Sequence, residues 1–207
     1  MILEKSDANT LLVGSGETIN RVPDTGLKAA MAKVPEAFVA RLAFMTPEHH
    51  LVRNFAVREL PYENGRPIKV DRMAATLGLA TTRVHAIVED LERHLFFLVR
   101  NEAGEISWAF PVTTEPTPHR LQFSTGERAH GALAEDAFAT PFVQGRLRGE
   151  KLSIELESEC AHCGRVLHIS VDSELNSQVR EKEADPLLFE PDVDWKTFKG
   201  ANIINDY

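Results

Sequence analysis

The sequence predicts an α+β fold, in which an N-terminal winged-helix-like module precedes a compact core of mixed helices and strands. Apolar residues recur at helical spacing between residues 27 and 60, and a helix–turn–helix–hairpin pattern follows over residues 66–110. Beyond it, short strand patterns surround one helical segment. We therefore expect an N-terminal arm over residues 1–26, a helical and winged-helix-like domain over 27–110, and a core domain over 111–207.

The composition is that of an ordinary globular protein. Of the 207 residues, 43% are hydrophobic and 26% are charged, which is typical of soluble domains. The net charge of −8 argues against a general nucleic-acid binder, because such proteins neutralise phosphates with a basic surface. The first residues lack the basic and apolar regions of a signal peptide, and no apolar run is long enough to cross a bilayer. We expect a soluble, cytoplasmic protein with no membrane partner.

The first helical segment is defined by apolar residues three and four positions apart, from Ala30 to Met45. Pro47 stands where a helix can start, since the first helical position needs no N–H donor. The pair His49-His50 follows directly. We interpret this pair as lying on the surface or in the first turn of a helix. The polar residues before this segment predict a flexible or loosely docked arm.

The second unit has the local signals of two helices and a hairpin. Residues 70–79 predict a short helix that Gly78 ends. Residues 81–91 predict the next helix, with Thr81 or Thr82 as its N-cap. Strand patterns then flank a turn that contains a glycine, at the residues 96–100, 101–105 and 106–110. Together these elements make the winged-helix-like pattern.

A winged helix binds DNA through its second helix. Here that helix has Arg83 and His85 near its start, but Glu89, Asp90 and Glu92 follow. These acids would repel phosphates, so we favour a module that serves packing. A winged-helix regulator with a ligand-sensing core stays open as an alternative.

The core domain begins with a Thr- and Pro-rich connector over residues 111–118, which should be extended. A helix is expected from Glu135 to Val143, and the polar stretch 172–183 is expected to form another. Strands are expected in three places: residues 119–124, 151–157 and 166–171.

Residues 114–121, Thr-Glu-Pro-Thr-Pro-His-Arg-Leu, resemble the T-x-x-P-T-P-H-R segment of the organomercurial lyase family, where it also follows a winged-helix-like region. Further landmarks come in the family's order: Asp136, Pro141, Gly145-Arg146, the turn at Cys160 and the late Trp195. The resemblance covers roughly residues 66–198. It implies a two-part fold with a compact α+β core of the organomercurial lyase type.

The resemblance also implies a reaction, the protonolysis of a carbon–mercury bond. In the family, two thiolates hold the mercury, because this soft metal prefers sulfur. A carboxylate helps to deliver the proton to the leaving carbon, and the resemblance assigns that role to Asp136. The alternative role for Asp136 is structural, since an acid near a helix start stabilises the helix dipole.

The two thiols are missing where the family pattern needs them. The first falls at Leu133, or at Gly131 if two residues are inserted. The second falls within residues 181–189, which contain no cysteine. The resemblance therefore implies a carbon–mercury lyase whose catalytic cysteines are absent and whose reaction is lost or altered.

The only two cysteines of the chain, Cys160 and Cys163, form a Cys-x-x-Cys-Gly pattern. Such a turn can aim both sulfurs at zinc or another soft metal, with His162 and His168 as candidate further ligands. A pair of reduced thiols without metal fits the pattern equally well. Two class-level alternatives follow: a metal- or thiol-binding accessory protein, and a lyase that uses Cys160 and Cys163 with Asp136. The expected partner is a small molecule or a metal ion.

Overall fold

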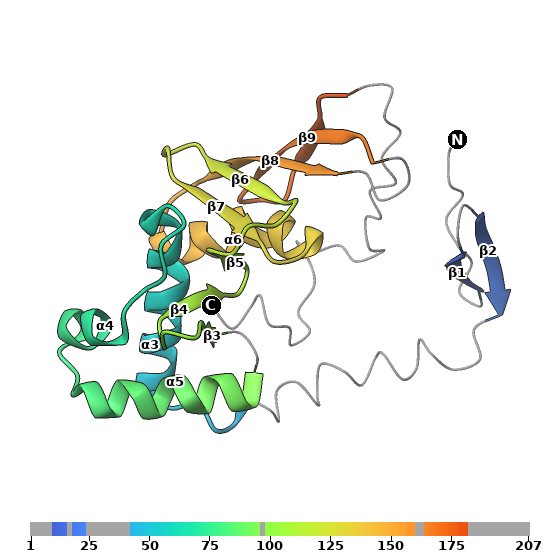
Figure 1. Ribbon diagram of the computed structural model, residues 1–207. Coiled ribbons are helices and arrows are strands. Elements are labelled where there is room, and N and C mark those ends of the chain that lie inside the picture. The colour runs from blue at the N-terminus through green and yellow to red at the C-terminus, as the bar shows by residue number, and fades with distance from the viewer. Residues whose placement is uncertain (1–9, 16–17, 24–41, 96–97, 160–163, 182–207) are drawn as a thin grey trace.

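The computed structural model describes residues 10–15, 18–23, 42–95, 98–159 and 164–181. It has the predicted α+β fold, with helices packed beside and against an antiparallel sheet of eight strands (Figure 1). The sheet has the strand order β10-β9-β8-β6-β7-β5-β4-β3. A separate hairpin is formed near the N-terminus by β1 (Thr10–Ser15) and β2 (Thr18–Pro23). The predicted boundaries of the arm and of the two domains stay predictions.

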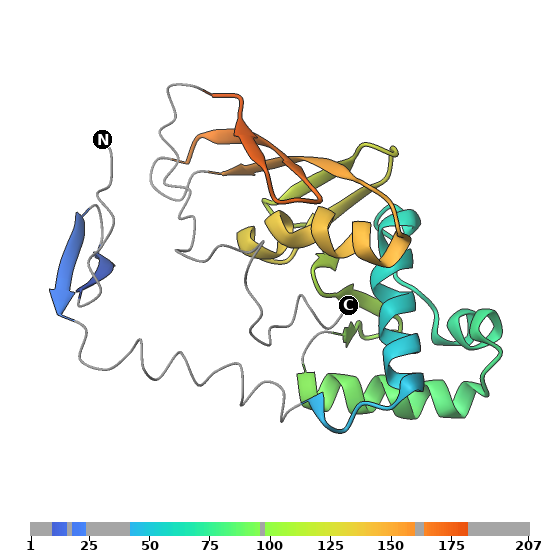
Figure 2. The ribbon, with the colours of Figure 1, turned by 180° about the vertical axis from the view of Figure 1, so that it is seen from behind.

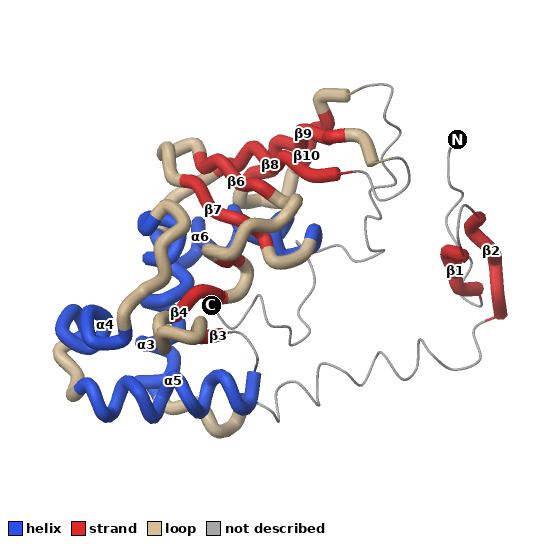
Figure 3. The backbone as a smooth tube through the Cα atoms, viewed as in Figure 1, coloured by secondary structure: helices blue, strands red, loops and turns tan. Residues whose placement is uncertain are grey.

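The helices of the N-terminal helical and winged-helix-like part gather at one end of the described structure (Figure 3). Pro47 is the first residue of its first helix, as predicted, and Gly78 ends the next one in a left-handed conformation with φ of 67°. The predicted order of helix, turn, helix and hairpin is present. The part of the first predicted helix before residue 42 lies outside the described residues. The elements are α3 (Pro47–Glu59), the 3-10 helix η1 (Leu60–Glu63), α4 (Val70–Leu77), α5 (Thr81–Leu95), β3 (Leu98–Arg100) and β4 (Ile106–Ala109).

His49 lies in the first turn of α3, which is one of the two places expected for it. It is not a surface residue, however, because only 4% of it is exposed. Its Nδ1 accepts a hydrogen bond from the backbone N–H of Thr46 at 3.2 Å, so its ring completes the N-terminal cap of the helix. Phe44 covers the ring edge-on, with 5.4 Å between the ring centroids.

The core contains the three predicted strands and the predicted helix. This helix extends further than expected in both directions. A strand at residues 128–131 was not predicted. Its buried residues are the small Ala129 and Gly131, which give no apolar signal. The elements are β5 (Val112–Thr113), β6 (Arg120–Phe123), β7 (Arg128–Gly131), α6 (Ala134–Arg148), β8 (Ser153–Glu159), β9 (Val166–Asp172) and β10 (Ser177–Val179).

The helix predicted over residues 172–183 is wrong for the part that the structure describes. The carboxylate of Asp172 accepts hydrogen bonds from the backbone N–H groups of Glu174 and Asn176. These bonds close a turn, and the chain then returns as β10 beside β9. The side chain of an aspartate thus competes successfully with helix formation.

One helix, α6, lies against one face of the sheet in both opposed views (Figures 1 and 2). Inward-facing residues of β8, such as Ile154 and Leu156, are buried, while neighbouring glutamates face outward. This alternation is the pattern of a sheet covered on one face. The sheet itself continues across residue 110, because Ala109 of β4 pairs with Val112 of β5.

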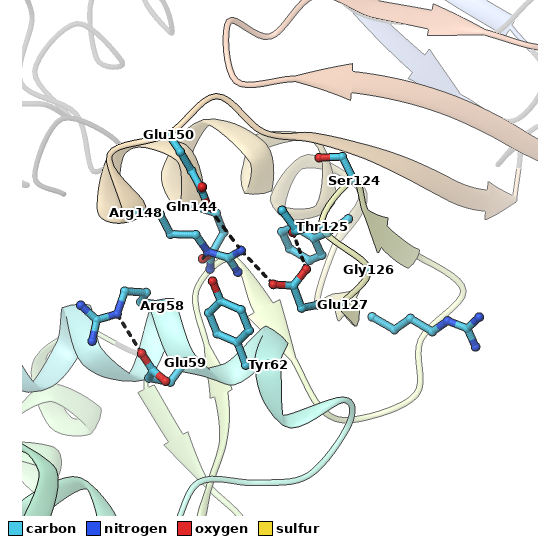
Figure 4. A network of polar contacts seen from close by, with 12 residues as sticks. Arg58, Glu59, Tyr62, Ser124, Thr125, Gly126, Glu127, Gln144, Arg148 and Glu150 are labelled. Atoms are coloured by element: carbon cyan, nitrogen blue, oxygen red, sulfur yellow. Dashed lines mark hydrogen bonds and ion pairs between the residues drawn. The ribbon is translucent and has the colours of Figure 1, made fainter.

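The C-terminal end of α6 is fixed by a buried arginine (Figure 4). The side chain of Arg148 is 4% exposed and forms an ion pair with Glu127 at 3.1 Å. Its guanidinium group lies 4.2 Å from the ring centroid of Tyr62, in η1. One turn earlier, Gln144 donates a hydrogen bond to the carbonyl of Val57 in α3. These contacts join the core helix to the helical unit. Among the described residues, no helix is long and apolar enough to span a membrane.

Candidate functional site at the start of helix α6

Asp136 is the third residue of α6 and is 8% exposed. The residue that caps this helix is Leu133, whose extended backbone has φ of −127° and whose side chain makes no capping bond. The backbone N–H of Leu133 instead hydrogen-bonds the carboxylate of Asp136. This is half of a capping box, in which the third helical residue reaches back to the cap. It places the carboxylate directly beside the backbone of position 133.

The environment of Asp136 favours its protonated form. Burial raises the pKa of the carboxyl, the hydrogen bond from Leu133 lowers it, and the negative charge of Glu135 raises it further, which gives a pKa of about 6. A carboxyl with such a pKa can donate or accept a proton near neutral pH. The helix-start role and the proton-transfer role of Asp136 are therefore compatible in this geometry.

The structure distinguishes between the two positions that the resemblance offers for the first thiol. A Cβ atom at Gly131 would lie 2.5 Å from the Cβ atom and 2.8 Å from the Cα atom of Ala137. No side chain fits there without displacement of the helix. Leu133, by contrast, is 58% exposed. Position 133 is thus the one that can carry a side chain beside Asp136, and that side chain is a leucine.

The segment that carries the family resemblance lies at the same end of the sheet. The hydroxyl of Thr117 donates a hydrogen bond to the carbonyl of Gly131 at 2.7 Å. The N–H of Gly131 donates one to the carbonyl of His119 at 2.9 Å. Because Gly131 also contacts Ala137, the start of β6, the end of β7 and the start of α6 meet here. Residues far apart in the sequence are thereby brought to one place.

Ser158, which the sequence did not predict as a site residue, belongs to the same place. Its hydroxyl lies 2.8 Å from Nδ1 of His119, and the residue is 7% exposed. It occupies an inward-facing position near the end of β8. Only the pairing of β6 with β8 brings it beside His119, so no local sequence signal could have identified it.

Three of the four candidate metal ligands, Cys160, His162 and Cys163, lie outside the described residues. The residues that flank them are described. The hairpin pairs Glu159 with Val166 at this end of the sheet, one residue beyond Ser158. The last paired residues on either side of the cysteine-containing segment, Glu159 and Val166, thus lie opposite each other in β8 and β9.

His168, the fourth candidate, is held by two carboxylates. Its Nδ1 lies 2.6 Å from Glu181 and its Nε2 lies 3.8 Å from Glu157. Hydrogen bonds from the backbone N–H and the ring of His168 lower the pKa of Glu181. Within the described residues, no three histidine, cysteine or acidic side chains are grouped to hold a metal ion. The zinc site at the two cysteines stays a prediction.

Of the comparisons with known proteins, the one with solved structures gives matches. No protein-family model matches the sequence, and no curated protein sequence matches it. Among solved structures, the fold is similar to the crystal structure of the mercury-bound form of MerB2, an organomercurial lyase. The TM-score is 0.57 at 16% sequence identity, over 73% of this chain and 68% of that one. This likeness shows that the chain has a MerB-like α+β fold.

Proposed function

We propose that this chain is an organomercurial-lyase-like protein in which the protonolysis of carbon–mercury bonds is lost or altered. The fold supports the first half of the proposal, and the helix start supports the second. Asp136 has the burial and the raised pKa of a proton donor. The neighbouring position that would present a thiol presents Leu133, and a leucine cannot hold mercury.

The observation that carries this proposal is the bond between the N–H of Leu133 and the carboxylate of Asp136. It fixes the spacing of the two positions within one turn of helix, so that a thiolate at 133 would stand beside the acid. An organomercurial bound there would receive its proton from Asp136 as the carbon–mercury bond breaks, leaving a hydrocarbon and a mercury ion. Without the thiolate, the first requirement of this reaction is missing.

The test measures, by gas chromatography, the release of benzene from phenylmercuric acetate at high protein concentration. We expect release no faster than from a matched solution of free cysteine at the same thiol concentration. This control contains as many thiols as Cys160 and Cys163 supply in the protein, but without the fold. Release by the protein well above that control would contradict the loss of the reaction.

A second candidate function has a specific observation in its favour. Because the segment with Cys160 and Cys163 joins the sheet beside Ser158, its thiols are candidates to replace the lost pair. In this form the protein is a lyase that uses both cysteines with Asp136. Benzene release that disappears in Cys160→Ser, in Cys163→Ser and in Asp136→Asn would establish it, whereas release that persists in Asp136→Asn would exclude it.

The two cysteines could instead hold zinc, with His162 and His168 as further ligands, in an accessory protein without turnover. Since His168 is bonded to Glu181, a metal would have to displace that carboxylate or do without the histidine. Metal analysis of the purified chain tests this. Zinc at one equivalent that is lost in Cys160→Ser and retained in His168→Gln would assign the cysteines and not the histidine.

Contacts at the start of α5 support the expectation that nucleic acid is not the partner. Arg83, which a DNA-binding helix would use, forms an ion pair at 2.7 Å with Glu48 of α3. Further along, the side chain of Glu89 is 62% exposed. This face of the helix therefore presents cations that acids already neutralise, Arg83 with Glu48 and Arg93 with Glu89.

A further inference from the structure

A cleft of about 500 Å³ lies away from Asp136, among the loop after η1, the start of α4 and the end of the turn before β4. Its volume is in the range of small-molecule sites. Apart from Pro67, the lining consists of charged residues: Glu63, Arg66, Lys69, Arg72 and Glu105.

The loop that forms the cleft is held by its own hydrogen bonds. Asn64 and Gly65 both have positive φ, of 49° and 85°, which turns the chain sharply after η1. The backbone N–H and the Nε of Arg66 both donate to the carbonyl of Glu63, each at 3.2 Å. Ile68 then exchanges two backbone hydrogen bonds with Ile106, each at 2.9 Å. The cleft is therefore largely formed before any ligand arrives.

The charges of the lining do not cancel. Glu63 is nearly buried and forms an ion pair with Arg72, so these two neutralise each other. Two cations, Arg66 and Lys69, then face one acid, Glu105, and none of these three has an ion-pair partner among the described residues. In a chain with a net charge of −8, this is a local excess of positive charge in a concave place.

We propose that this cleft binds a small phosphate-bearing anion. Phosphate oxygens are acceptors for the donors of Arg66 and Lys69. A hydrogen phosphate also has a hydroxyl, which can donate to the carboxylate of Glu105. This mixture of acceptors and one donor matches a lining of two cations and one acid. Sulfate has the same tetrahedral shape and at least as much negative charge as phosphate, but it lacks the hydroxyl, so a preference for phosphate would report the bond to Glu105.

The experiment is a two-dimensional 1H–15N NMR titration of the full chain with inorganic phosphate at pH 6.5 and constant ionic strength. Saturable shifts are expected in the amides of residues 66–72. The double variant Arg66→Gln/Lys69→Gln should bind at least tenfold more weakly, since each exposed charge pair contributes a few-fold. Lys151→Gln, which removes an exposed cation from another part of the chain, should leave binding unchanged.

Several outcomes would overturn the proposal. Shifts that do not saturate, or that sodium chloride reproduces, would mean that phosphate has no site. Unchanged binding in the double variant would remove the cleft from the interaction. Binding of sulfate as tight as that of phosphate would remove the role of Glu105, and Glu105→Gln should erase the difference between the two anions. Saturable binding of a short DNA duplex but not of phosphate would assign this surface to nucleic acid instead.

The site does not depend on the chemistry of Asp136. Both outcomes of the organomercurial assay leave the phosphate titration interpretable, and Asp136→Asn should bind phosphate as the wild type does.

Discussion

The backbone N–H of Leu133 hydrogen-bonds the carboxylate of Asp136, three residues further along the chain. The bond makes the two residues a single unit at the start of α6. It stabilises the helix, and it places the backbone of position 133 beside the acid. The side chain at position 133 is an exposed leucine, so this helix start combines a buried acid with a neighbouring position that has no thiol, as the proposed function requires.

The raised pKa of Asp136 predicts how stability depends on pH. The carboxyl has an ordinary value of 3.8 and a folded value of about 6. Above pH 6 both states are ionised, and the folded state bears the cost of a buried charge. Below about pH 4 both are protonated, and the cost is absent. The substitution Asp136→Asn should therefore stabilise the protein at pH 7.5 by about 1–3 kcal/mol, and this gain should vanish toward pH 4.

Urea unfolding at several pH values measures this effect, and 13C NMR of the carboxyl measures the pKa directly. Glu135→Gln is the matched control, because it removes the adjacent exposed charge. It should change stability by no more than about 0.5 kcal/mol. A wild-type pKa near 4 would contradict the account of the site.

The incomplete capping box predicts a stabilising substitution at the cap. In Leu133→Ser the new hydroxyl can accept a hydrogen bond from the N–H of Asp136, which completes the reciprocal pair. We expect a gain of about 1 kcal/mol relative to Leu133→Ala in urea unfolding. The alanine variant separates the cap from the loss of the leucine. If both variants are equally destabilised, the leucine has a packing role that its 58% exposure does not suggest.

Gly131 should not tolerate a side chain. The Cβ atom of Gly131→Ala would lie within 3 Å of three atoms of Ala137, so the start of α6 would have to move. A loss of about 1–3 kcal/mol is expected. Adding Ala137→Gly removes the nearest contact and leaves two backbone contacts, so recovery should be partial. Wild-type stability of the single variant would reopen position 131 as a place for the first thiol of the family pattern.

The buried pair of Arg148 and Glu127 should be a sensitive point of the fold. Burial would raise the pKa of Glu127, but a hydrogen bond from Thr125, its own backbone N–H and the charge of Arg148 lower it below its ordinary value. Arg148→Met leaves this carboxylate buried without its cation, and should cost about 3–5 kcal/mol. Adding Glu127→Gln should recover part of that loss.

The control for this pair is Arg180→Met. Arg180 pairs with Glu155 at 3.3 Å, but the two side chains are 65% and 50% exposed, so the loss should stay below about 1 kcal/mol. Equal losses from Arg148→Met and Arg180→Met in thermal or urea unfolding would contradict the importance of the buried pair.

Local patterns predicted much of this fold, and long-range contacts determined the rest. Pro47 and Gly78 mark helix ends by their own backbone preferences, so those ends could be read directly. Strand β7 has small buried residues, and its place depends on pairing with β5 and β6. Arg148 looks like a surface residue in the sequence, because Tyr62 and Glu127, which bury it, lie far away in the chain.

The same holds for the candidate site: the family pattern predicted one residue, and long-range contacts determined the others. Asp136 was predicted through the family resemblance, and the structure places it at a helix start with the Thr117–His119 segment nearby. Ser158 was missed, since it meets His119 only through strand pairing. The choice between Leu133 and Gly131 was open in the sequence, and the contact of Gly131 with Ala137 decides it.

The most direct test of the central claim compares benzene release from phenylmercuric acetate by the wild type and by Asp136→Asn, at equal and stoichiometric protein. If the ancestral reaction is lost because Leu133 replaces the thiol, the two proteins should release benzene at the same background rate. Release by the wild type that is at least tenfold faster, and that the Asp136→Asn substitution abolishes, would show that the reaction survives and would contradict the claim.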